Sequence, residues 1–151
     1  MIPVPVGPEG TDLQALRTLC SQRRVKAVYC MPTMHNPLGF VLTLQQRQEL
    51  AAIARQHGLL VLEDAAYAYL AAPAVVPVAA LAPERTVYIG GLSKNLATGL
   101  RFGYISAPPA MMGAIERAIR ATTVNSPALV TALVCRWLMD GTCLLYTSLM
   151  A

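Results

Sequence analysis

The sequence predicts an α/β fold, a three-layer sandwich in which helices cover both faces of a mostly parallel sheet. Residues 27–31 and 59–62 are short, unbroken apolar runs, which are typical of strands buried inside a parallel sheet. Between these runs lies a segment with the spacing of an amphipathic helix. Strand, loop, helix and strand in this order predict a right-handed βαβ crossover.

A helix and a strand are expected first. Asp12 is a typical helix start and precedes apolar residues at helical spacing, so we expect a helix that ends at the polar residues 21–24. Residues 27–31 then form a strand that stops at Pro32. The loop at residues 33–39 follows, and its proline and glycine content predicts a turn of fixed shape at the carboxyl end of the strand.

The second helix is expected between Thr43 and Gly58. Thr43 and Gln46 form a candidate capping box, and Gly58 is a typical C-terminal stop. The strand at residues 59–62 follows directly and runs into Asp64. Because the carboxyl ends of parallel strands lie at one edge of a sheet, the loops after both strands are expected at the edge where α/β proteins bind ligands.

The second half of the chain is expected to add two strands and two helices. Residues 65–70 predict a short helical turn, and residues 71–83 predict an apolar loop broken by prolines. Apolar spacing and proline stops then predict strands at residues 86–89 and 102–106 and helices around residues 111–119 and 127–140.

The composition favours a protein with apolar surface for a partner. Hydrophobic residues make up 55% of the chain and charged residues 13%, which is rich for a free-standing domain. We therefore expect some of this surface to contact another domain or subunit. No apolar run is long enough to span a membrane, and the N-terminus lacks the features of a signal peptide, so a cytoplasmic location is expected.

Charge and cysteine content exclude two other classes of function. The net charge of +4 is mild and the arginines are spread along the chain, so we expect no nucleic-acid binding by this segment. The four cysteines lack CxxC spacing and have no nearby histidine pair. They are expected to be small core residues in a reducing compartment, and no metal site is expected.

Three chemically useful side chains follow the third expected strand. Arg101 can hold phosphate oxygens in a bidentate fork, and Ser93 can add one hydrogen bond. Lys94 lies between them and is free to attack an aldehyde. The chain has only one other lysine, Lys26, which is typical of a solvated charge before a strand, so Lys94 is the better candidate for a Schiff base. The alternative is an ordinary loop in which Lys94 and Arg101 face water.

The predicted topology brings three more polar residues to the same edge of the sheet. Asn36 lies in the loop after the first strand, Asp64 ends the second, and Tyr67 follows three residues later. Each also has a simpler interpretation: Asn36 as a turn residue, Asp64 as a helix cap or surface acid, and Tyr67 as a core residue.

Three segments resemble signatures of the fold-type I pyridoxal-phosphate enzymes, and specifically of the class I/II aminotransferases. They are HNPLG at residues 35–39, EDAAY at residues 63–67 and GGLSKNLATGLRFGY at residues 90–104. The resemblance spans residues 2–141 and extends to the aminotransferase-like domain of MocR-type transcriptional regulators. It implies the large domain of a pyridoxal 5′-phosphate (PLP)-dependent transferase, with residues 1–142 as an incomplete, central part of that PLP-binding domain.

The resemblance implies a role for each polar residue at the edge. Lys94 would form the Schiff base with PLP and move the proton between the substrate α-carbon and the cofactor. Asp64 would pair with the pyridine nitrogen and keep the ring protonated. Asn36 and Tyr67 would donate hydrogen bonds to the ring oxygen O3′.

The resemblance also implies a phosphate clamp. Ser93 and Arg101 would hold the 5′-phosphate, and Gly91 stands where many aminotransferases have a further phosphate-binding serine. Fewer phosphate contacts are therefore expected here. His35 and His57 have no partner that suggests acid–base chemistry and are expected to be structural.

Three functions are compatible with these residues. The first is an aminotransferase that moves an amino group between an amino acid and a 2-oxo acid, as a homodimer in a full-length parent protein. The second is the PLP-binding effector domain of a MocR-type regulator. The third is an inactive fragment, because family members are more than twice as long and have phosphate-loop and carboxylate-binding parts that are not matched here. Residues 143–151 fit no expected element and are predicted to be a non-native or truncated tail.

Overall fold

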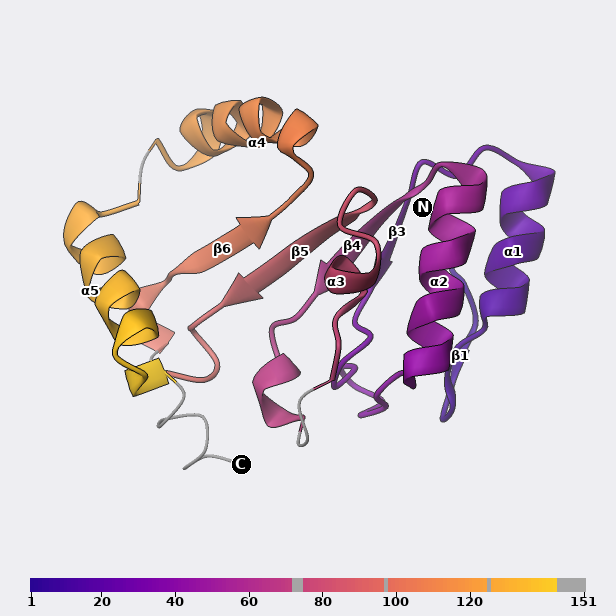
Figure 1. The fold of residues 1–151 in the computed structure, drawn as a ribbon, viewed down its shortest axis with the longest axis horizontal. Helices are drawn as coiled ribbons and strands as arrows, with labels where there is room; N and C mark the ends of the chain where they lie inside the picture. The colour runs from indigo at the N-terminus through magenta and orange to yellow at the C-terminus, as the bar shows by residue number, and fades with distance from the viewer. Residues whose placement is uncertain (72–74, 97, 125, 144–151) are drawn as a thin grey trace.

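The protein is built on a four-stranded sheet flanked by helices (Figure 1). The computed structural model describes residues 1–71, 75–96, 98–124 and 126–143. The sheet order is β3 (Ala27–Cys30), β4 (Leu60–Asp64), β5 (Thr86–Gly91) and β6 (Gly103–Ser106). The pairs β3–β4 and β4–β5 are parallel, and β6 is antiparallel to β5. The predicted α/β fold with a mostly parallel sheet is confirmed.

The first helix, α1 (Leu13–Gln22), begins where the sequence predicts it. The side chain of Asp12 accepts a hydrogen bond from the backbone N–H of Ala15 at 2.8 Å, which satisfies one of the free donors of the first turn. Leu13, Leu16 and Cys20 are buried on one face of the helix. Before α1, a small antiparallel hairpin, which the periodicity did not indicate, pairs β1 (Val6–Gly7) with β2 (Gly10–Thr11).

The second helix, α2 (Leu44–His57), has the predicted capping box. Thr43 Oγ1 accepts from the N–H of Gln46 at 3.2 Å, and Gln46 Oε1 accepts from the N–H of Thr43 at 2.8 Å. Gly58 ends the helix with φ of 65°, in the left-handed region that favours glycine. The helix therefore connects β3 to β4, as the βαβ prediction requires.

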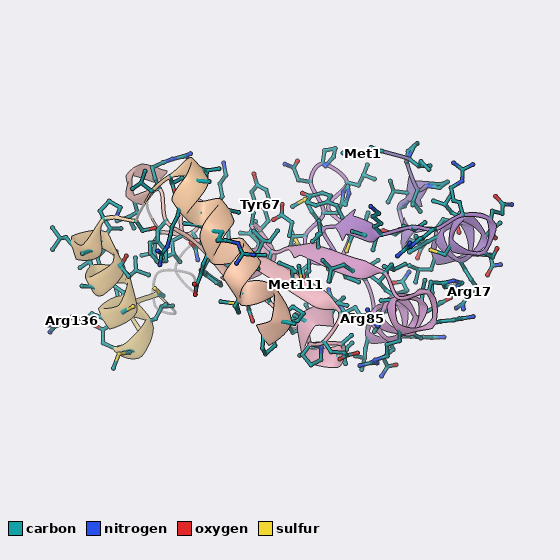
Figure 2. All side chains as sticks on the ribbon, turned by 90° about the horizontal axis from the view of Figure 1, so that it is seen from above. Met1, Arg17, Tyr67, Arg85, Met111 and Arg136 are labelled. Atoms are coloured by element: carbon teal, nitrogen blue, oxygen red, sulfur yellow. The ribbon has the colours of Figure 1, made fainter. Side chains whose placement is uncertain are left out.

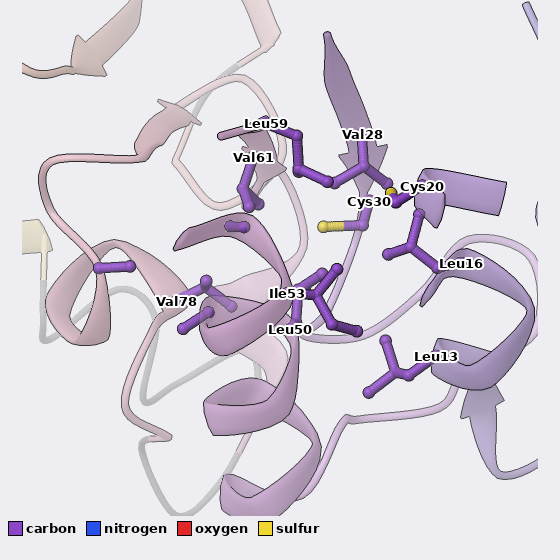
Figure 3. Close-up of a cluster of buried hydrophobic side chains, with 13 residues drawn as sticks. Leu13, Leu16, Cys20, Val28, Cys30, Leu50, Ile53, Leu59, Val61 and Val78 are labelled. Carbon is purple, nitrogen blue, oxygen red and sulfur yellow. The ribbon is translucent and has the colours of Figure 1, made fainter. Parts of the chain in front are cut away.

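The core lies between α1, α2 and one face of β3 and β4 (Figure 3). Because side chains alternate along a strand, Val28 and Val61 face this core and Tyr29 faces the other side of the sheet. Val61 and Ile53 are completely buried, whereas Tyr29 keeps 60% of its surface exposed. Val78 joins the same cluster from α3 (Val78–Leu81).

Two predictions for the middle of the chain were wrong in detail. The expected loop at residues 71–83, of which residues 72–74 lie outside the described part, contains the short helix α3. The expected strand at residues 86–89 extends through Gly90 and Gly91, which pair with β6. A Cβ at Gly90 would collide with the ring of Tyr104, so glycine here permits close packing and does not break the strand.

The second half of the chain has the expected helices but little buried surface. The segment after β4 forms η1 (Ala68–Leu70), and η2 (Thr98–Leu100) precedes β6. The long helices are α4 (Pro109–Thr122), which has no buried residue, and α5 (Ala128–Met139), which buries only Val134. Arg17 of α1 and Arg136 of α5 lie at opposite ends of the long axis of the molecule (Figure 2).

The prediction that the four cysteines are core residues is correct for three of them. Cys20, Cys30 and Cys143 are buried, but Cys135 is exposed, because it lies on α5, a helix of which the structure buries only Val134. Beyond Cys143, the predicted tail lies outside the described residues. Among the helices of the described ranges, none combines the length and apolar character that a bilayer crossing requires.

Candidate functional site

The polar residues singled out in the sequence stand at one edge of the sheet. β3, β4 and β5 run parallel, so their carboxyl ends meet at that edge. Asn36 lies in the loop after β3, Asp64 is the last residue of β4, and Lys94 lies three residues beyond β5. β6 returns antiparallel from the same end, which places Arg101 at this edge as well.

Asp64 is held by two hydrogen-bond donors. Its Oδ1 accepts from the backbone N–H of Ala66 at 2.9 Å, and its Oδ2 accepts from the hydroxyl of Tyr29 at 2.7 Å. Partial burial, followed by the contact with Asp64, raises the pKa of Tyr29 to about 12. The sequence interpretation missed Tyr29. Strand alternation could have found it, because Tyr29 pairs with Leu62, which lies on the same face as Asp64.

The loop that carries Asn36 closes on itself. The ring of His35 stacks on Phe40 with centroids 4.4 Å apart, and the backbone N–H of His35 donates to the carbonyl of Phe40 at 3.0 Å. The peptide bond between Asn36 and Pro37 is cis. These contacts fit the structural role expected of His35, and the side chain of Asn36 is exposed.

A buried arginine, which the sequence interpretation missed, ties the two ends of this loop together. Arg47 of α2 keeps only 1% of its surface exposed. Its Nη2 donates to the carbonyl of Pro32 at 2.7 Å, and its Nε donates to the carbonyl of Leu42 at 2.9 Å. Nη2 also donates to Thr33 Oγ1 at 2.8 Å. Pro32 and Leu42 bracket the loop, so Arg47 fixes the base from which Asn36 is presented.

Glu63 and Asp64 are adjacent but serve opposite faces of the sheet. Glu63 is 1% exposed, lies 3.9 Å from Arg47 and accepts from the N–H groups of Val78 and Ala79 at 3.1 and 2.8 Å. Burial raises the pKa of Glu63, although these donors and Arg47 oppose the shift. Glu63 therefore caps α3 inside the protein, and Asp64 is the carboxylate that faces the site.

The loop with Lys94 is fixed from two sides. The hydroxyl of Tyr69, in η1, donates to the carbonyl oxygen of Lys94 at 2.9 Å. Leu92 is buried, and its N–H donates to the carbonyl of Phe102 at 3.1 Å, which closes the base of the loop. The side chain of Lys94 is exposed. Its backbone is therefore held while its amine stays accessible.

Ser93 and Arg101 lie next to the two residues that close this base. Ser93 follows Leu92 and is half-buried, and Arg101 precedes Phe102 and is exposed. Arg101 has φ of 48°, a left-handed conformation that is costly for a residue with a side chain and that clusters at functional sites. Tyr67 is half-buried at the start of η1 and belongs to the same segment as Tyr69.

These groups suit a phosphorylated aldehyde with a basic ring nitrogen. The edge offers an accessible amine on Lys94, a carboxylate on Asp64 and a guanidinium on Arg101. A carboxylate binds a protonated ring nitrogen, an amine condenses with an aldehyde, and a guanidinium binds phosphate. The donor set therefore matches the functional groups of PLP.

Comparison with known proteins identifies the family. The sequence pattern of aminotransferase class I and II matches residues 4–143. The chain belongs to this family. Members of the family bind PLP. The aminotransferase segments recognised at residues 35–39, 63–67 and 90–104 all lie inside the matched region.

Relatives of this chain include enzymes and regulators. It is 32% identical over 144 residues to 2-aminoadipate transaminase of Thermus thermophilus, a match that covers 91% of the chain and 36% of the relative. It is 29% identical over 140 residues to the uncharacterized HTH-type transcriptional regulator YdeF of Bacillus subtilis, covering 91% of the chain and 30% of the relative. The chain thus spans about a third of the length of these curated relatives.

Solved structures give the same family and fold. LysN, the α-aminoadipate aminotransferase of Thermus thermophilus in complex with N-(5′-phosphopyridoxyl)-L-leucine, is 31% identical with a TM-score of 0.86, over 93% of the chain and 38% of LysN. The multiple substrate aminotransferase of Thermococcus profundus superposes with a TM-score of 0.91 at 24% identity, over 97% of the chain and 38% of that enzyme. The latter likeness shows the aminotransferase fold.

Proposed function

We propose that the chain supplies the cofactor-binding centre of a PLP-dependent aminotransferase that moves an amino group between an amino acid and a 2-oxo acid. The supporting observation is that Asn36, Asp64 and Lys94 follow three adjacent parallel strands and reach the same edge of the sheet. The identity with a 2-aminoadipate transaminase supports the same reaction class.

In this proposal Lys94 is the catalytic residue. Its amine would hold the cofactor through the aldehyde carbon, with loss of water, and would take and return the proton at the substrate α-carbon. PLP, when bound, supplies the electron sink for this chemistry. The hydrogen bond from Tyr69 to the carbonyl of Lys94 supports the role, because it holds the backbone while the side chain remains free to move.

The remaining residues bind and orient the cofactor. Asp64 holds the proton of the pyridine nitrogen, and Asn36 and Tyr67 donate hydrogen bonds to the ring oxygen O3′. Ser93 and Arg101 hold the 5′-phosphate. The hydrogen bond between Leu92 and Phe102 supports this last assignment, because it brings the two phosphate-binding positions to the base of one loop.

A second candidate function is the PLP-binding effector domain of a MocR-type regulator. The identity with the HTH-type regulator YdeF of Bacillus subtilis over 91% of the chain favours it. Both functions use the same residues of this chain. They differ in turnover: an aminotransferase converts an added amino acid to its 2-oxo acid, whereas an effector domain binds the ligand without sustained conversion.

We also propose a cellular compartment and an assembly for the protein. Cys20, Cys30 and Cys135 form no disulfide, which supports a reducing compartment such as the cytoplasm. Leu129 and Met139 of α5 are 81% and 88% exposed, which supports a second subunit or domain against this helix. A homodimer is the expected assembly.

Trapping of the cofactor tests the proposal directly. We expect that borohydride reduction of the chain mixed with PLP fixes a phosphopyridoxyl group on Lys94, detected by peptide mass spectrometry. Lys94→Ala is expected to abolish the adduct, and Lys26→Ala, the matched control at the only other lysine, is expected to retain it. Labelling of Lys26 in preference to Lys94 would contradict the assignment.

A further inference from the structure

We propose that Tyr29 is a positioning residue that aims the carboxylate of Asp64 at the pyridine nitrogen of PLP. The proposal rests on the proposed function, because it concerns the same site. It adds a residue that lies outside the three recognised segments and that acts only through Asp64. The contact that supports it is the 2.7 Å hydrogen bond from the hydroxyl of Tyr29 to Oδ2 of Asp64.

The contact follows from the register of the sheet. Tyr29 of β3 pairs with Leu62 of β4, and side chains two residues apart on a strand share a face, so Tyr29 and Asp64 lie on the same side. The phenol is long enough to reach diagonally from the position of Leu62 to that of Asp64. β3 therefore contributes a donor to the last residue of β4.

Two donors from different elements fix the plane of the carboxylate. The N–H of Ala66 comes from the turn after β4, and the hydroxyl of Tyr29 comes from β3. One donor alone would leave the carboxylate free to rotate about its bond to Cβ, whereas one donor on each oxygen removes that freedom. Each oxygen of a carboxylate has two lone pairs, so Asp64 can still accept the N–H of a pyridinium ring.

The hydroxyl of Tyr29 contributes little to the packing of the fold. The side chain is 60% exposed and lies on the face of the sheet opposite the core. Tyr88, by contrast, lies on the same face as Glu63 and stacks on Tyr104 with centroids 6.3 Å apart. Removal of the Tyr29 hydroxyl is therefore expected to change the orientation of Asp64 and to leave the fold intact.

Cofactor affinity measures the predicted effect. We expect Tyr29→Phe to weaken PLP binding by the full-length chain about fivefold, the equivalent of one hydrogen bond, in a fluorescence titration. Tyr88→Phe, the matched loss of a hydroxyl on the other face, is expected to stay within twofold of the wild type. Thermal unfolding followed by circular dichroism verifies that both variants fold.

A double-mutant cycle tests whether Tyr29 acts through Asp64. In the Asp64→Ala background, Tyr29→Phe is expected to change the affinity by less than twofold, because the group that it orients is gone. Equal effects in both backgrounds, or no effect in either, would overturn the inference. If the wild-type chain forms no adduct at Lys94, the proposed function fails and this inference fails with it. If the wild type forms the adduct and Tyr29→Phe binds PLP normally, the inference alone is wrong.

The cofactor-free protein gives a second readout. Burial and, after it, the contact with Asp64 raise the pKa of Tyr29, so Asp64→Ala is expected to lower that pKa part of the way toward the ordinary tyrosine value. Carbon NMR of labelled tyrosine rings follows the titration, and the Tyr29→Phe spectrum identifies the signal. An unchanged titration in Asp64→Ala would overturn the contact on which the inference depends.

Discussion

The half of the molecule built on β3 and β4 is packed around a buried core, whereas the half that carries α4 and α5 is open. Ile53 of α2 is completely buried, but Ile119 of α4 is 41% exposed, although each belongs to the apolar side of its helix. An apolar stripe thus indicates a helix and not its burial, since burial also needs an element to pack against. The site residues before β5 are supported by the packed half.

The largest loss of stability is expected when Arg47, the buried arginine of the packed half, is replaced. Arg47→Leu removes the donors to Pro32 and Leu42 and leaves Glu63 buried beside an apolar side chain. We expect the free energy of unfolding to fall by about 3–5 kcal/mol, measured by urea denaturation. Burial also lowers the pKa of Arg47, which shows how far the guanidinium is removed from water.

The matched control is an arginine in a more accessible ion pair. Arg17 lies 3.2 Å from Glu49, and about a third of its side chain is exposed, at 35%. Arg17→Leu is expected to cost at most about 1 kcal/mol. Similar losses in the two variants would show that the buried network is not what stabilises the packed half.

An effect of intermediate size is expected when an isoleucine is replaced by alanine in α2 and, for comparison, in α4. Ile53→Ala opens a cavity in the core and is expected to cost about 2–4 kcal/mol. Ile119→Ala removes the same atoms from the open half and is expected to stay within about 0.5 kcal/mol. Thermal or urea unfolding of the pair measures the difference. Equal losses would mean that α4 is packed in solution, which would break the comparison.

The smallest expected effect is at the start of α2. Thr43→Ala removes the side-chain cap on the N–H of Gln46 and is expected to cost about 1 kcal/mol in urea denaturation. Thr122→Ala is the control, because its hydroxyl donates to Ala118 within α4 and caps no free N–H. If Thr43→Ala lowers the free energy of unfolding no more than Thr122→Ala does, α2 is held by its buried face alone.

Local patterns were sufficient to predict the strands and the long helices. The capping box of α2 and the apolar runs of β3 and β4 depend on neighbours in sequence. α3 was missed because its first N–H groups donate to Glu63, which precedes them by 15 and 16 residues. The extension of β5 through Gly90 was missed because the ring that requires a glycine there belongs to Tyr104.

The residues of the candidate site fall into the same two groups: those that a local motif identifies and those that depend on contacts between distant residues. The six residues predicted for it come from contiguous motifs, which can be recognised without a structure. Tyr29, Arg47 and Tyr69 support those motifs through partners 35, 15 and 25 residues away in the chain. Such contacts depend on strand register and on the conformation of the loops, and neither can be predicted from a single sequence segment.

The paired acids at the end of β4 make this strand intolerant of a register slip. Because Glu63 and Asp64 point to opposite sides, an inserted or deleted residue earlier in β4 would exchange them. Asp64, which has the shorter side chain, would then lie on the side of Arg47, and Glu63 would lie on the side of Tyr29, so neither acid would keep its present contacts. A single indel here would therefore disable the scaffold and the binding edge together, although every residue type involved would still be present.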